Sequence, residues 1–170
     1  DRRTAQKGPV TNPKNSWSKR AMIKRYKLCF DVWGLLLFLI IMVPNFIWFV
    51  IPAPKDILSA DSVTGALDTV ALVCQILMIT ALCMLRNKES KKMRVTPFVI
   101  LVLCCCFLYF ASWIAYYNAI INGIVILGLT ILPCLAFLFF AADRKNGIAI
   151  IPISVFTICH LIYGVVNFII

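Results

Sequence analysis

The residues best suited to chemistry lie in the last apolar stretch of the chain. His160, the single histidine of the sequence, is followed by Tyr163 and Asn167. Spacings of three and seven residues place all three side chains on one face of a helix. This face predicts a polar site within an otherwise apolar helix.

Two earlier apolar stretches carry polar faces of the same kind. Asn45 and Trp48 share a face in the first, Asp68 and Gln75 share one in the second, and Tyr116 ends the third. Polar groups are unfavourable in lipid unless they pair or line a wet cavity, so we expect them to surround a cavity. The residues predicted to bind a ligand are Asn45, Trp48, Asp68, Gln75, Tyr116, His160, Tyr163 and Asn167.

Each of these residues also has a purely structural explanation. His160 could donate a hydrogen bond to a neighbouring carbonyl, and Asp68 could cap its helix, because acids are favoured near helix N-termini. The Trp and Tyr residues could form an interfacial belt. Asn45 could join helices or satisfy a kink at Pro44. The sequence leaves these alternatives open.

Asp68 and His160 are the one clear acid and the one clear base in these polar faces. If their helices touch, opposite charges within about 4–6 Å would each favour the partner's charged form. The pair would then act as a proton-coupled switch, which is a hypothesis at this stage.

The elements that position these residues are five apolar stretches, and the composition indicates a membrane protein. The chain is 62% hydrophobic with a mean hydropathy of +0.92, whereas soluble chains are about 45–50% apolar. Crossing a bilayer takes about 20 apolar residues. We therefore predict an all-α integral membrane protein, a bundle of five transmembrane helices, with kinks at Pro44 and Pro133. The predicted spans are 28–53, 66–85, 96–117, 120–142 and 148–170.

Positive charge predicts the orientation of this bundle. Every Lys and Arg except Lys55 falls in segments 1–27, 86–94 or 143–147, which five spans put on one side of the membrane. The positive-inside rule then makes the N-terminus cytoplasmic and the C-terminus extracytoplasmic. Residues 1–27 form a basic cytoplasmic tail, disordered or interfacial, and residues 28–170 form the transmembrane domain. The polar faces then lie in the outer half of the membrane, so the cavity is expected to open outward.

Motifs for enzymatic chemistry are not found in the sequence. There is no Walker loop, HExxH, GxSxG or CxxC motif, and the eight cysteines fall in or beside apolar stretches as small hydrophobes. The sequence therefore predicts no catalytic residues, no metal site and no cofactor, and it favours a protein that is not an enzyme.

The function predicted from these features is binding or transport of a small polar or amphipathic ligand through an outward-facing intramembrane cavity. The alternative is a non-catalytic accessory or assembly subunit of a larger membrane complex. Expected partners are anionic lipid headgroups at the basic tail and at 86–94, a small-molecule ligand, and a second copy or a partner membrane subunit, but not nucleic acid. Short loops and Lys-rich linkers resemble those of small bacterial inner-membrane proteins, which implies the bacterial cytoplasmic membrane.

Overall fold

The computed structural model describes residues 25–59, 63–90 and 94–169. These segments form five helices, each long and apolar enough to cross a membrane, which confirms the predicted all-helical class and the number of helices. The helices are α2 (Val32–Val50), α3 (Gly65–Met84), α4 (Pro97–Tyr117), α5 (Gly123–Asp143) and α6 (Gly147–Phe168). Most of the predicted basic tail, residues 1–24, lies outside the described residues.

The first helix is shorter than the predicted span 28–53 at both ends. Helix α2 begins after Asp31, whose side chain accepts a hydrogen bond from the backbone N–H of Trp33 at 3.1 Å and so caps the helix. It ends at Val50, and Ile51 is extended. Pro52 follows, and the residue before a proline is disfavoured in the helical region.

Two three-residue strands were not predicted from the sequence. Strand β1 (Tyr26–Leu28) pairs antiparallel with β2 (Leu85–Asn87). The N–H of Asp31 continues this pairing by donating to the carbonyl of Cys83 at 2.7 Å. The sheet therefore ties the start of α2 to the end of α3. We call this end of the bundle, with the α5–α6 turn, the β end, and the opposite end, with residues 51–64, the loop end.

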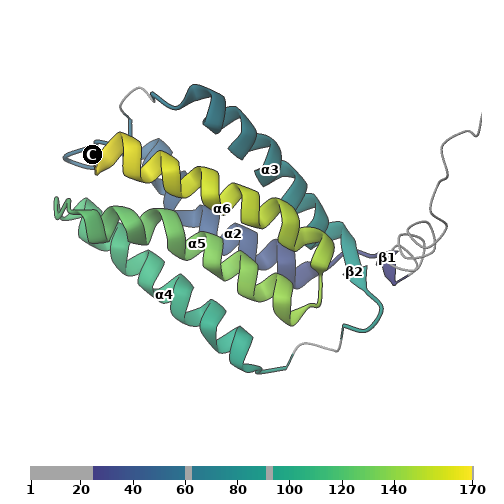
Figure 1. Ribbon diagram of the computed structural model, residues 1–170. Helices are drawn as coiled ribbons and strands as arrows, with labels where there is room; N and C mark the ends of the chain where they lie inside the picture. The colour runs from purple at the N-terminus through teal and green to yellow at the C-terminus, as the bar shows by residue number, and fades with distance from the viewer. Residues whose placement is uncertain (1–24, 60–62, 91–93, 170) are drawn as a thin grey trace, which may run out of the picture.

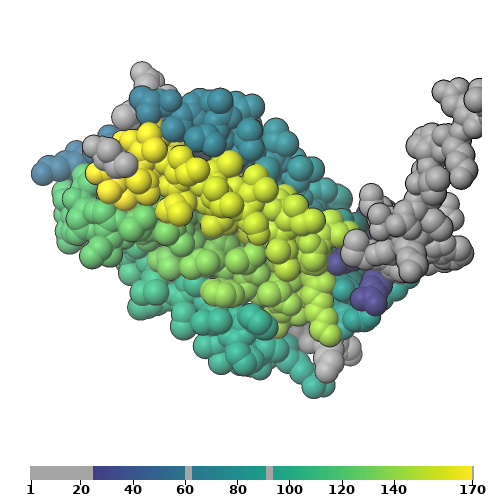
Figure 2. Space-filling view, viewed as in Figure 1, coloured from purple at the N-terminus to yellow at the C-terminus, as the bar shows by residue number. Residues whose placement is uncertain are grey.

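Four of the helices form a row in the order α4, α5, α6, α3, in which neighbours pack side by side (Figure 1). On the face shown in Figure 2, the side chains of α6 fill the space between α3 and α5. Helix α2 lies behind this row and contacts α3, α4 and α5. The row and α2 together can enclose a space between them.

Gly34 and Gly164 each permit a close approach between two helices. A Cβ atom on Gly34 would lie 2.8 Å from the carbonyl oxygen of Leu82, so α2 meets the backbone of α3 directly at the β end. A Cβ atom on Gly164 would lie 2.6 Å from Cγ2 of Thr130, where α6 crosses α5. Any larger residue at either position would push the two helices apart.

Pro44 and Pro133, the predicted kink positions, lie inside the continuous helices α2 and α5. In each case the next residue donates a side-chain hydrogen bond to the carbonyl four positions back. Asn45 donates to the carbonyl of Ile41 at 3.1 Å, and the thiol of Cys134 donates to Thr130 at 3.2 Å. These bonds satisfy backbone acceptors beside the proline, and the kinks themselves stay a prediction.

Candidate functional site

All five helices line a cavity of ≈ 530 Å³ between α2 and the row. This volume is within the range of about 300–1,000 Å³ that is usual for small-molecule pockets. Six of the eight residues singled out in the sequence line it. They are Asn45, Trp48, Asp68, Gln75, His160 and Tyr163.

The other two, Tyr116 and Asn167, do not line the cavity but fasten the 51–64 segment to the bundle. The hydroxyl of Tyr116 donates to the carboxylate of Asp56 at 2.8 Å and accepts from the backbone N–H of Leu58 at 3.2 Å. Asn167 accepts from the backbone N–H of Val63 at 2.9 Å and donates to a side chain at the start of α3. Both residues therefore have structural contacts that account for their polarity.

The α2 wall of the cavity is held by Asn45 and Tyr109. The Asn45 amide donates to the Tyr109 hydroxyl at 2.8 Å, and that hydroxyl donates to the carbonyl of Ile41 at 3.3 Å. Asn45 thus joins α2 to α4, as the structural alternative for this residue supposed. Sequence reasoning missed Tyr109 because it lies in the middle of an apolar run.

Two tryptophans present buried indole N–H groups in the described part of the chain, and that of Trp113 is directed toward the Tyr109 hydroxyl. Nε1 of Trp48 and Nε1 of Trp113 are both buried, and neither has an acceptor at normal hydrogen-bond distance and angle among the described residues. Trp113 is only 5% exposed, and both residues line the cavity. A buried donor without a partner destabilises a structure by about 1–3 kcal/mol, so such groups usually have a function.

The α6 wall is a stack of three rings centred on His160. The imidazole lies parallel to Phe156 at a ring-centroid distance of 5.1 Å and to Tyr163 at 5.9 Å. Within the described part of the chain, neither imidazole nitrogen makes a hydrogen bond or an ion pair. The supposed structural hydrogen bond from His160 to a neighbouring carbonyl is therefore not found there, and the ring edge is left for another partner.

The α3 wall contributes Asp68 and Gln75. Asp68 lies in the first turn of α3 and accepts a hydrogen bond from the Thr64 hydroxyl at 3.1 Å. It interacts electrostatically with His160, but no ion pair within 4.0 Å joins these two described residues. The side-chain amide of Gln75 makes no hydrogen bond to any described residue.

The polarity of the cavity changes along its length. Toward the β end the walls are Phe38, Met78, Phe137 and Phe156, whereas Trp48, Asp68 and Tyr163 lie toward the loop end. Among the described lining residues, Asp68 is the one acid, and no Lys or Arg is present. The cavity therefore offers an apolar pocket below a polar region that contains one carboxylate.

The two most exposed side chains of the cavity lining are both apolar. Phe49 of α2 is 71% exposed and Leu72 of α3 is 57% exposed, more than any other described lining residue. These helices are tied together at the β end by the sheet and the Gly34 contact. The exposed part of the lining therefore belongs to the loop-end halves of α2 and α3.

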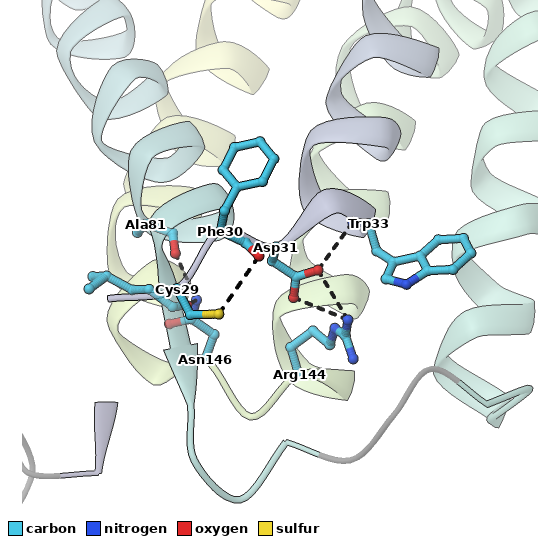
Figure 3. Close-up of polar contacts among 8 residues, drawn as sticks. Cys29, Phe30, Asp31, Trp33, Ala81, Arg144 and Asn146 are labelled. Atoms are coloured by element: carbon cyan, nitrogen blue, oxygen red, sulfur yellow. Dashed lines mark hydrogen bonds and ion pairs between the residues drawn. The ribbon is translucent and has the colours of Figure 1, made fainter. Parts of the chain in front are cut away.

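A second polar cluster lies at the β end, away from the cavity (Figure 3). Arg144 forms an ion pair with Asp31 at 3.1 Å, and each side chain is 6% exposed. The Asn146 amide donates to the carbonyls of Ala81 at 2.9 Å and Leu85 at 2.8 Å. These contacts fix the α5–α6 turn against the ends of α2 and α3.

The cavity can hold a ligand by shape, by ring contacts and by the unpaired polar groups of three helices. Among the described residues, no three His, Cys, Asp or Glu side chains gather as a metal-ligand set.

Comparisons of this chain with protein-family models, with curated proteins and with solved structures give no match.

Proposed function

We propose that this chain is a multi-pass membrane protein that binds or transports a small ligand in the cavity between α2 and the row of four helices. The observation that carries the proposal is the set of cavity-lining polar groups without partners in the described structure. These groups are His160, Gln75 and the indole N–H of Trp48. A ligand could supply hydrogen-bond partners to all three, and at the buried indole N–H of Trp48 it would remove the unfavourable free energy of an unsatisfied donor.

The distribution of charge supports an orientation for the bundle. Every described Lys and Arg except Lys55 lies at the β end. By the positive-inside rule this end is cytoplasmic, with the N-terminus inside and the C-terminus outside. The cavity's polar region then belongs to the outer half of the membrane, and the membrane we propose is the bacterial cytoplasmic membrane.

Filling the cavity tests the proposal. Ala71 lines the cavity, whereas its neighbour Val70 is 47% exposed and does not line it. Ala71→Phe and Val70→Phe therefore add an aromatic ring to the same turn of α3, one inside the cavity and one outside. Native mass spectrometry of the gently solubilised protein should show a bound small molecule on the wild type and on Val70→Phe, but not on Ala71→Phe.

Two results would contradict ligand binding in the cavity. One is an equal bound mass on Ala71→Phe and Val70→Phe, which would put the molecule elsewhere on the surface. The other is a ligand-free protein that purifies with a second membrane chain. That result would make the accessory-subunit function the better account.

A further inference from the structure

We infer that the ligand of this cavity is a cationic amphiphile, a molecule with an amine or quaternary ammonium group and an apolar body, which enters from the lipid between α2 and α3. The inference rests on the proposed function, because it names the class of ligand for the same cavity. Three features support it: the border of the opening, the charge of the lining, and its aromatic rings.

The border of the opening indicates entry from lipid. We place the opening beside Phe49 and Leu72, because they are the two exposed residues of the lining and both are apolar side chains on helices of membrane-spanning length. A strictly hydrophilic ligand would have to cross this apolar border without any polar contact. A molecule with an apolar body, already dissolved in the bilayer, meets no such barrier.

The charged residue of the cavity lining indicates the sign of the charge on the ligand. Asp68 is the one acid among the described lining residues, and no Lys or Arg accompanies it. Its carboxylate accepts a hydrogen bond from a neutral hydroxyl, that of Thr64. A carboxylate in a region of low dielectric is stabilised by a nearby positive charge and repels a negative one. An anionic headgroup, such as a phosphate, is therefore disfavoured.

Aromatic rings surround the region of this carboxylate. Asp68 interacts electrostatically with His160 and with Tyr163, whose rings stack parallel to each other. Trp48 lines the same cavity from α2. Ring faces attract a cation within about 6 Å, and tryptophan does so best. A carboxylate beside several aromatic rings is the side-chain chemistry that suits an ammonium group.

The polarity of the cavity then orients the ligand. The ammonium group lies toward the loop end beside Asp68, and the apolar body extends toward the β end. There it contacts Phe38, Met78 and Phe137, which line the deep part of the cavity.

A pair of probes tests this inference on the full chain in lipid nanodiscs after removal of bound molecules. One is a radiolabelled alkyl trimethylammonium, and the other is its uncharged tert-butyl isostere. We expect the wild type to bind the cation at least about tenfold more tightly than the isostere. Asp68→Asn should reduce cation binding to the level of the isostere. Asp143→Asn, the same charge change at the β end, should leave it unchanged.

The failure of this inference can be told apart from failure of the proposed function. Equal binding of both probes to the wild type would contradict a cationic ligand but would leave ligand binding in the cavity intact. This comparison does not depend on the folding of any variant. Binding of neither probe would also overturn the cationic amphiphile. The proposed function would fall if Ala71→Phe retained the same bound mass as Val70→Phe, or if the protein purified free of ligand with a second membrane chain.

Discussion

The two polar clusters of this molecule differ in how their groups are satisfied. At the β end, Asp31 is paired with Arg144, and Asn146 bonds two backbone carbonyls. In the cavity, His160 and Gln75 have no hydrogen-bond partner among the described residues. Both clusters are built from polar side chains within or directly beside apolar helices, so the types of residue alone do not show which groups are satisfied. Their partners do.

The difference indicates which cluster serves stability and which is available to a ligand. Removing one member of a satisfied pair leaves the other buried and unpaired, which is strongly destabilising. Removing a group that has no hydrogen-bond partner loses no hydrogen bond. Variants at the β end should therefore unfold more easily, while variants in the cavity should keep their stability and lose the ligand.

The largest effect is expected for Arg144→Leu. This change leaves the Asp31 carboxylate buried without its ion pair, so the free energy of unfolding in detergent should fall by about 3–5 kcal/mol. Denaturant titration followed by circular dichroism measures it. The double variant Asp31→Leu/Arg144→Leu should regain most of the loss. A double variant as unstable as the single one would mean that the charges do not depend on each other.

Asn146→Ala should have the second largest effect. It removes the two hydrogen bonds from the Asn146 amide to the carbonyls of Ala81 and Leu85, at about 1 kcal/mol each, so a loss of about 2 kcal/mol is expected. Asn118→Ala, at an exposed helix end, is the matched control and should change the same titration by less than half as much. Equal losses for both would remove the special role of the β end.

Gly34→Ala tests whether the close approach of α2 and α3 stabilises the β end. The added Cβ would lie 2.8 Å from the carbonyl oxygen of Leu82, so α2 and α3 must separate there. Overpacking of this kind destabilises by about 1–2 kcal/mol. At Gly65 a Cβ would meet nothing within 4 Å, and Gly65→Ala should be neutral or slightly stabilising. The melting temperatures of the two variants measure this difference, and equal values would contradict a tight contact at Gly34.

Gln75→Leu should have the smallest effect on stability. In contrast to the β-end variants, it should weaken ligand binding instead of folding. Its amide makes no hydrogen bond to described residues, so the free energy of unfolding should change by no more than about 0.5 kcal/mol. Native mass spectrometry should nevertheless show less bound ligand. A loss of stability as large as that of Asn146→Ala would place Gln75 among the structural residues instead.

Much of the fold follows from periodicity and charge in the sequence. The five helices are evident because each apolar stretch has the length that a bilayer demands. Helical spacing also places Asn45 with Trp48, and Asp68 with Gln75, on shared faces. The structure turns these faces toward one cavity, although the role of a ligand there stays a prediction.

Other contacts could not be predicted because no local pattern encodes them. Asp31 and Arg144 are 113 residues apart, and each stands at a helix end where a charge is expected anyway. Tyr116 and Asn167 repeat the pattern of the cavity residues, yet they bind the 51–64 segment, whose path depends on tertiary packing. Strand β1 joins β2 across two helices for the same reason.

The most direct test of the account is the effect of ligand on stability. The small molecules released from the purified protein are added back to protein stripped of them, and the melting temperature is measured for the wild type and for His160→Leu/Gln75→Leu. A ligand that binds the folded cavity raises the melting temperature by mass action. We predict a clear rise for the wild type and none for the double variant. An equal rise in both, or none in either, would contradict the claim that the unpaired groups of this cavity bind a ligand.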